Sequence, residues 1–161
     1  MRRAFTLIEL MISIAIVAVL ATIVTAAVLP ARVKARDTVR VAEMSQMGRF
    51  LLAISCYVPS AGPGDYDLQA LYVDLVAANP QVAQYVSAAP RDPRSGTDTE
   101  SGYRYRYTAD GKCVLYANLE NPDTQVTLTG LTAPTPGGGT GVLKASSEGP
   151  NGSDIYFQIG R

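Results

Sequence analysis

The sequence predicts an α+β protein in which a long N-terminal helix precedes a head built on an antiparallel β-sheet. An uncharged apolar run from Leu10 to Leu29 is long enough to cross a bilayer as a helix. Apolar residues at spacings of three and four extend the helical pattern to about Val58. Near Tyr103 the period changes to two, which is typical of strands. We therefore expect a helix with a membrane-spanning half and an amphipathic half, packed on a sheet.

The apolar run is interrupted only by the hydroxyl side chains of Ser13, Thr22 and Thr25. These hydroxyls can donate hydrogen bonds to carbonyls of their own helix. Glu9 stands at the front of the run. A carboxylate in a membrane helix costs about 2–3 kcal/mol at mid-bilayer and is usually functional. The alternatives are a secretory signal peptide cut near Ala26-Ala27 or Ala31, and a solvated Glu9 at the membrane interface.

Beyond the run, Pro30 is expected to kink or locally melt the helix. An apolar stripe suited to packing on a sheet follows: Met44, Met47, Leu51, Ile54 and Val58. The helix is expected to end near 57–59, before the breaker at 60–64. The long helix would thus cover residues 5–58, with its membrane span at about 10–29, and the head would cover 59–161.

The head opens with helical signals. Asp67 is expected to cap a helix, with an apolar face of Leu68, Leu71, Tyr72, Leu75 and Val76. Asn79 then caps a further helix with Pro80 at its first position. Strands are expected at 103–107 and 112–119, joined by the turn Asp110-Gly111, and at 125–131 and 155–159. Residues 132–141 are expected to form a flexible loop.

The composition excludes most familiar catalytic chemistries, and we expect no enzyme. The 161 residues include no histidine and two cysteines, which excludes imidazole-based catalysis and the common zinc sites. Basic and acidic residues number 14 each, which excludes a generally basic nucleic-acid binder. Seven of the basic but three of the acidic residues lie at or before Arg49, so the two parts of the chain are expected to have different surroundings.

Residues 4–11 read Ala-Phe-Thr-Leu-Ile-Glu-Leu-Met and resemble the class III signal of type IV prepilins and type II secretion pseudopilins. The resemblance implies the pilin fold and a leader of residues 1–4, cut between Ala4 and Phe5 by a membrane prepilin peptidase. The same enzyme would N-methylate Phe5, and Glu9 would be the assembly glutamate. The sequence departs from the family at Ala4, where glycine is nearly always found.

The position of Glu9 agrees with the assembly role that the resemblance implies. Glu9 lies one turn after Phe5 on the same helix face, yet it cannot easily reach the ammonium of its own Phe5. A neighbouring subunit displaced along a filament axis can bring its ammonium alongside Glu9. Such pairing in an apolar filament core would stabilise docking and penalise wrong registers.

From Pro90 to Tyr116 the head is also similar to type II secretion major pseudopilins, at Asp92-Pro93, Gly102-Tyr103, Tyr105, Gly111 and Leu115-Tyr116. Those proteins bind calcium in a loop near the C-terminus; otherwise no cofactor is expected. Oxygen ligands suited to calcium stand in two loops, at Asn118, Glu120, Asn121 and Asp123, and at Glu148, Asn151, Ser153 and Asp154. Their spacing does not reproduce the family's, and such residues are also common in turns.

Two further patterns involve the strands. Tyr103, Tyr105 and Tyr107 alternate with Arg104 and Arg106, which favours a strand with an aromatic core face; the alternative is a stacking platform for nucleic acid in a DNA-uptake pilus. Cys56 and Cys113 are expected to form a disulfide between helix and sheet outside the cytoplasm, the alternative being two separate buried thiols.

These features predict a structural subunit of a type IV pilus-like filament. The alternatives are a type II secretion pseudopilin and, in another class, a membrane-anchored periplasmic binding domain that does not polymerise. The expected partners are other copies of itself, other pilins, the prepilin peptidase, the pilus or secretion assembly platform and the membrane. The protein would cross the inner membrane once with a cytoplasmic N-terminus and then join a periplasmic or cell-surface filament, although basic residues on both sides of the span leave the charge rule undecided.

Overall fold

The computed structural model describes residues 6–161, and for Ala26 and Ala27 it describes the helical backbone alone. The chain divides into two compact units, residues up to Ala35 and residues from Arg36 onward. Helix α1 (Leu7–Leu51) contributes its first part to the first unit and its last turns to the second. Each unit is described by itself below.

The first unit is the apolar part of α1. Its large side chains are exposed on every side of the helix, from Leu7 at 75% to Leu29 at 63%. The hydroxyls within it bond to carbonyls of the same helix, as expected: Ser13 Oγ donates to Glu9 O at 2.7 Å and Thr25 Oγ1 to Ala21 O at 3.1 Å. The helix continues through Pro30, so the local melting expected there does not occur.

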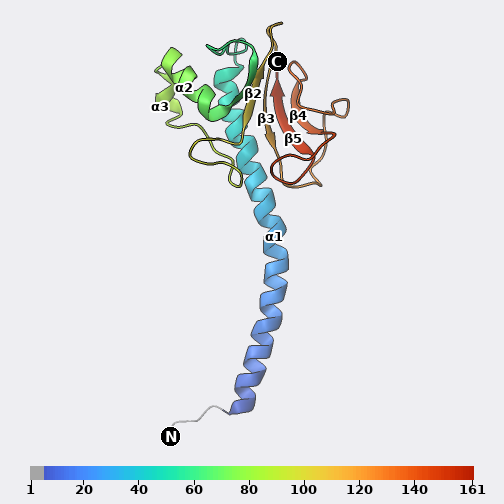
Figure 1. The fold of residues 1–161 in the computed structure, drawn as a ribbon. Helices are drawn as coiled ribbons and strands as arrows, with labels where there is room; N and C mark the ends of the chain where they lie inside the picture. Colours follow the sequence, from blue (N-terminus) through green and yellow to red (C-terminus); the bar gives the residue numbers. More distant parts are fainter. Residues whose placement is uncertain (1–5) are drawn as a thin grey trace. The chain divides into compact units, whose positions relative to one another are not determined.

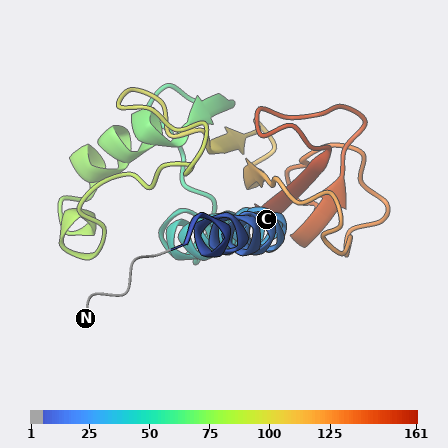
Figure 2. The same ribbon diagram turned by 90° about the horizontal axis from the view of Figure 1, so that it is seen from below.

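The second unit contains a five-stranded antiparallel sheet in the order β1-β2-β3-β5-β4. Its strands are β1 (Gly64–Asp67), β2 (Arg104–Tyr107), β3 (Cys113–Asn118), β4 (Thr140–Lys144) and β5 (Ile155–Gly160). Helices α2 (Leu68–Ala78) and α3 (Val82–Tyr85) lie on the β1 side of this unit, and β4 forms the opposite edge (Figures 1 and 2).

The core of the second unit lies between the last turns of α1 and one face of the sheet. From the expected helix stripe, Met44, Met47 and Leu51 are buried in this core. The facing strands contribute Tyr105, Leu115 and Phe157, which alternate with outward-facing residues. The amphipathic half of α1 therefore packs on an antiparallel sheet, which confirms the predicted α+β class.

Several local predictions are confirmed. Asp67 caps α2, with its carboxylate accepting from Gln69 N at 2.8 Å. The β2–β3 hairpin forms with Gly111 in its turn at φ +80°, a conformation that favours glycine. In the predicted face of α2, Leu68, Leu71 and Leu75 are buried.

The predicted end of the long helix was wrong by seven residues. Helix α1 ends at Leu51, and Ile54 and Val58 of the expected stripe are exposed. The chain turns back after Leu51, whose carbonyl accepts from Tyr57 N at 2.8 Å. Arg161 satisfies the next two carbonyls from outside the helix, because its Nη1 donates to Leu52 O and Ala53 O.

Other elements also differ from the expectation. The segment 125–131 is not a strand; Thr127 N and Leu128 N both donate to one carbonyl of β4, that of Val142. Strands β1 and β4 occupy segments where no strand was expected. Helix α3 is one short turn capped at Gln81, so Asn79 and Pro80 precede it instead of beginning it.

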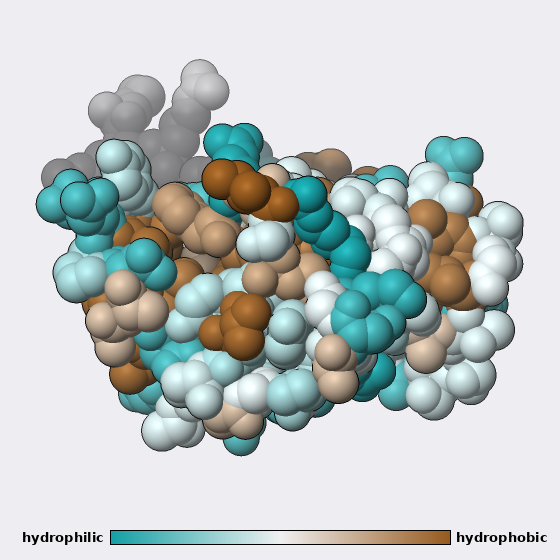
Figure 3. Space-filling model, turned by 90° about the horizontal axis from the view of Figure 1, so that it is seen from above, coloured by the Kyte–Doolittle hydropathy of each residue, from teal (hydrophilic) through white to brown (hydrophobic). Residues whose placement is uncertain are grey.

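On the face of the second unit seen in Figure 3, apolar and polar side chains are interspersed. Its exposed large apolar residues are few and separate along the chain: Val39, Ile54, Val58, Val73 and Tyr85. Isolated apolar residues of this kind are normal on a folded domain. The continuous apolar surface of the described chain thus belongs to the first part of α1.

Candidate functional site

The first turn of α1 carries the sequence-predicted Glu9. Its Oε2 accepts from Thr6 N at 3.0 Å and from Thr6 Oγ1 at 2.8 Å, and Glu9 N donates back to Thr6 Oγ1 at 3.3 Å. This reciprocal arrangement is a capping box, which satisfies amide groups left unpaired at a helix start. The other carboxylate oxygen, Oε1, has no hydrogen-bond partner among residues 6–161.

Ala4 and Phe5 lie outside the described residues. The predicted cleavage between them, the methylation of Phe5 and the pairing of its ammonium with Glu9 therefore stay predictions. The capping role of Glu9 was not predicted, although the spacing Thr-x-x-Glu in front of an apolar run is its known sequence signal.

Downstream of Glu9, α1 presents apolar side chains in all directions. Among the described helices it is the one long and apolar enough to cross a membrane, with a mean hydropathy of 2.7 over its most apolar window. A helix that is apolar all round is stable when lipid or other protein surrounds it. This part of the chain is therefore built to be enclosed by a bilayer or by other helices.

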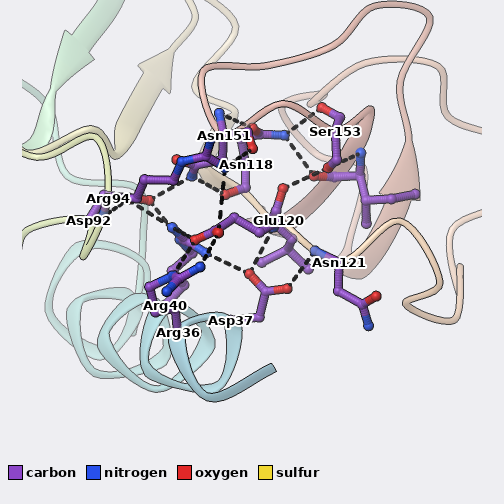
Figure 4. Close-up of polar contacts among 12 residues, drawn as sticks. Arg36, Asp37, Arg40, Asp92, Arg94, Asn118, Glu120, Asn121, Asn151 and Ser153 are labelled. Atoms are coloured by element: carbon purple, nitrogen blue, oxygen red, sulfur yellow. Dashed lines mark hydrogen bonds and ion pairs between the residues drawn. The ribbon is translucent and has the colours of Figure 1, made fainter. Parts of the chain in front are cut away.

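A buried cluster of charges holds the second unit together (Figure 4). Arg40 of α1 is completely buried. Its Nε and Nη2 donate to the two oxygens of Asp92 at 2.7 and 2.9 Å, Nη1 donates to Asp37 at 2.7 Å, and Nη2 also donates to Glu120 at 2.6 Å. One guanidinium thus joins the helix to two loops, one before β2 and one after β3.

The carboxylates of this cluster have further donors. Glu120 accepts two bonds from Arg36, and these, with those from Arg40, outweigh burial and lower its pKa to about 2. Burial alone would raise the pKa of Asp92, but bonds from Arg40, Ser95 N and Arg94 N hold it well below its usual range. Glu120 and Asp92 are therefore charged at neutral pH.

Asp37 extends the cluster to the backbone after β3. Its two oxygens accept from Glu120 N and from Asn121 N, both at 2.9 Å. Neither Arg40 nor Asp37 stood out in the sequence as a site residue. The available signal was their spacing of three on one helix, which places a carboxylate and a guanidinium side by side.

Several of the loop residues considered for calcium already bond to protein groups, while Asn151 Oδ1 is buried with no partner among residues 6–161. The carboxylate of Glu120 pairs with three arginines, Arg36, Arg40 and Arg94, which repel a cation. Asn118 bonds to the carbonyls of Ser153 and Ile155, and Asn151 donates to Asp92. Within residues 6–161, no group of three or more Asp, Glu, Cys or His side chains is arranged to hold a metal ion.

The predicted disulfide is confirmed. Cys56 and Cys113 are bonded, with their Cα atoms 5.8 Å apart, and they tie the segment after α1 to the first residue of β3. Arg161 lies beside this link, since its backbone exchanges hydrogen bonds with Cys113 at 2.7 and 2.8 Å. The C-terminal residue thus completes a junction between the end of α1 and the sheet.

Tyr103, which precedes β2, and Tyr105 of β2 do not form a platform for nucleic acid. Tyr103 and Tyr105 are fully buried in the core, where their hydroxyls donate to Glu43 and to the carbonyl of Tyr57. Arg104 and Arg106, on the other face, both donate to Asp65 of β1. The alternating tyrosines and arginines therefore pack in the core on one face of the sheet and form ion pairs on the other.

Comparison with known proteins adds one finding. Residues 1–25 match the family model described as the prokaryotic N-terminal methylation motif. Comparisons with curated proteins and with solved structures gave no match. The matched segment includes Ala4, Phe5 and Glu9 and continues into the apolar part of α1. The motif corresponds to a class III prepilin signal, and together with the long apolar helix packed on an antiparallel sheet it is consistent with the type IV pilin and pseudopilin family.

Proposed function

We propose that this chain is a structural subunit of a type IV pilus-like filament, cut before Phe5 by a prepilin peptidase and assembled through α1. The observation that carries the proposal is the apolar first part of α1, exposed on all sides and bearing a single carboxylate, Glu9, in its first turn. The role is structural and includes no catalysis.

The apolar surface of α1 suits two successive environments, first a membrane and then a filament. Before assembly, the segment from about residue 10 to 29 would span the inner membrane, with the N-terminus in the cytoplasm. The Cys56–Cys113 disulfide supports a head on the oxidising side of that membrane. In the filament, the same apolar surface would pack against the helices of other subunits, and the head would form the filament surface.

Glu9 would select the register of that packing. Its Oε2 caps its own helix, whereas Oε1 has no partner among the described residues. In the proposal, Oε1 accepts a charge-assisted bond from the N-terminal ammonium of a neighbouring subunit. In an apolar surrounding an unpaired carboxylate is costly, so subunits that leave Glu9 unpaired would dock poorly.

Three variants separate the charge of Glu9 from its capping role. Glu9→Gln keeps an oxygen that can accept from Thr6 but removes the charge, Glu9→Ala removes both, and Thr6→Val removes the cap while keeping the charge. We expect both Glu9 variants to insert into the membrane and be processed, yet to accumulate there with filament yield reduced at least tenfold. Thr6→Val should keep most of its filament yield.

The measurement is immunoblotting of sheared surface filaments against the membrane fraction, with electron microscopy of the sheared material. Normal filaments from Glu9→Ala would favour a membrane-anchored protein that does not polymerise. Normal filaments from Glu9→Gln together with failure of Thr6→Val would reduce Glu9 to a helix cap. Loss of protein secretion on gene deletion, with no surface filaments in the wild type, would place the chain in a secretion system instead.

A further inference from the structure

A cavity of about 330 Å³ opens on the sheet face opposite the core of the second unit. Four of its lining residues come from neighbouring strands and pair across them, Arg104 with Tyr116 and Asn118 with Tyr156. On β3 and β5 these residues alternate with the buried Leu115 and Phe157, so they point away from the core. The remaining lining residues are Asp67 at the end of β1 and the loop residues Ser95, Glu100, Gly102 and Pro150.

Two aromatic rings lie close together in this cavity. The rings of Tyr116 and Tyr156 have centroids 6.4 Å apart and planes inclined at 55°. The Tyr116 hydroxyl donates to Asp65 at 2.8 Å, which fixes the ring in place. The aromatic part of the cavity is therefore preformed, as in most small-ligand sites.

Several polar groups of the cavity lack partners within residues 6–161. The hydroxyl of Ser95 is buried and makes no hydrogen bond. Within residues 6–161, the Tyr156 hydroxyl and the Glu100 carboxylate also make no hydrogen bond. Arg104 bonds to Asp65 through Nε and Nη2, which leaves Nη1 available. A buried polar atom without a partner is costly, so a ligand that supplies one gains affinity.

The chemistry of these groups restricts the ligand. Glu100 disfavours an anion, and Arg104 disfavours a cation. Asp67 also lines the cavity, but its oxygens already accept from the backbone N–H groups of Gln69, Ser101 and Gly102. The hydroxyls both donate and accept, whereas the two rings offer apolar faces. The cavity thus calls for a neutral molecule that carries many hydroxyls together with an apolar C–H face.

We propose that this cavity binds a saccharide. A pyranose ring places its C–H face on Tyr156, because Arg106 already lies over the Tyr116 ring, and its hydroxyls bond to Glu100, Ser95 and the Tyr156 hydroxyl. The cavity volume is at the lower end of the range for small-molecule sites, which suits one or two sugar rings. This inference adds a binding role to the head and does not depend on filament assembly.

The test uses the full-length protein in a zwitterionic detergent without a sugar headgroup. Saturation-transfer NMR and titration would use glucose, galactose, mannose, N-acetylglucosamine and their β-1,4-linked disaccharides, with Nα-acetyl-lysine amide as a cationic probe. We expect saturable binding of at least one sugar. Glu100→Gln and Tyr156→Phe should each weaken it about tenfold, the usual effect of losing one strong hydrogen bond.

Matched controls are Asp123→Asn, an exposed carboxylate that does not line this cavity, and Tyr85→Phe, an exposed tyrosine at the end of α3; both should bind like the wild type. Glu100 is exposed, so its variant should keep the wild-type unfolding midpoint when no sugar is present. The proposal is overturned if no sugar binds saturably, if Glu100→Gln and Tyr156→Phe bind as tightly as the controls, or if acetyl-lysine amide binds in preference to every sugar.

Discussion

Arg40 is a guanidinium without solvent exposure, surrounded by carboxylates from three segments of the chain. Burying an ion pair gains little net stability over an apolar pair, but removing one partner is strongly destabilising because the remaining charge is left unpaired. Here the loss of one cation would leave Asp37, Asp92 and Glu120 close together, with Arg36 and, at 3.5 Å, Arg94 as the remaining guanidinium donors to Glu120.

We therefore expect Arg40→Ala to lower the free energy of unfolding by about 3–5 kcal/mol. Urea titration of the full-length protein in detergent, followed by circular dichroism, would measure the change. The control is Arg91→Ala, which breaks the exposed Arg91–Asp98 pair and should cost less than about 1 kcal/mol. Equal effects of the two variants would contradict the structural importance of the cluster.

The same cluster determines how stability depends on pH. Glu120 titrates at a pKa of about 2 in the folded protein, and the pKa of Asp92 is also lowered, whereas both groups titrate near 4 when unfolded. A lowered folded pKa contributes stability above the unfolded pKa, and this contribution is lost as the pH falls toward the folded pKa. Burial raises the pKa of Glu43, which acts in the opposite direction.

We expect the unfolding midpoint in urea to change little between pH 7 and 5 and to fall steeply between about pH 4 and 2. In Glu120→Gln, whose side chain does not titrate, the fall should be shallower, although the protein is less stable at pH 7. A titration of the midpoint in steps of half a pH unit checks both curves. A wild-type stability maximum below pH 4 would show that the raised pKa of Glu43 dominates.

At the scale of elements, the end of α1 depends on residues far away in the sequence. The disulfide holds Cys56 against β3, and Arg161 donates to the carbonyls of Leu52 and Ala53. The bonds from Arg161 satisfy carbonyl groups just after the last helical residue, Leu51. The periodicity of apolar residues alone would instead extend the helix to Val58. A side chain 108 residues from Ala53 cannot be placed by local pattern, which is why the predicted boundary failed.

The disulfide closes a loop of 57 residues, which corresponds to about 4 kcal/mol in the chain-entropy model. The double variant Cys56→Ser, Cys113→Ser should lose stability of this order in urea titrations. Wild-type protein treated with dithiothreitol serves as the matched control, because it should unfold at the same urea concentration as the double variant. A reductant that leaves the wild-type midpoint unchanged would contradict the prediction.

The elements that the sequence predicted are those with strong local signals. Asp67 caps α2 through its own side chain, and Gly111 supplies the turn of the β2–β3 hairpin. The unpredicted strands lack such signals: β1 reads Gly-Asp-Tyr-Asp, and β4 pairs with β5 beside a glycine-rich segment. In both, the pairing partner rather than local propensity makes the strand.

For the whole molecule, the uneven distribution of apolar and acidic residues along the sequence matches its division into two units. The apolar first part of α1 carries its carboxylate at one end, and the head gathers most of the acidic residues. Glu9, Cys56 and Cys113 were predicted because each has a recognisable context: a motif, or the minimal pair of thiols. The Arg40 cluster and the cavity proposed to bind a saccharide were not, because helix, strand and loop residues far apart in the sequence come together to form each of them.

The central claim is that the chain is a processed pilin-like subunit, and the N-terminus of the mature protein tests it most directly. Mass spectrometry of the protein from sheared filaments or from the membrane should show a terminal N-methylated Phe5 and the absence of residues 1–4. Ala4→Gly should be processed at least as fast as the wild type, because glycine is the usual residue before the cut. An intact Met1 in assembled material, or a terminus after Ala27 or Ala31, would contradict the account.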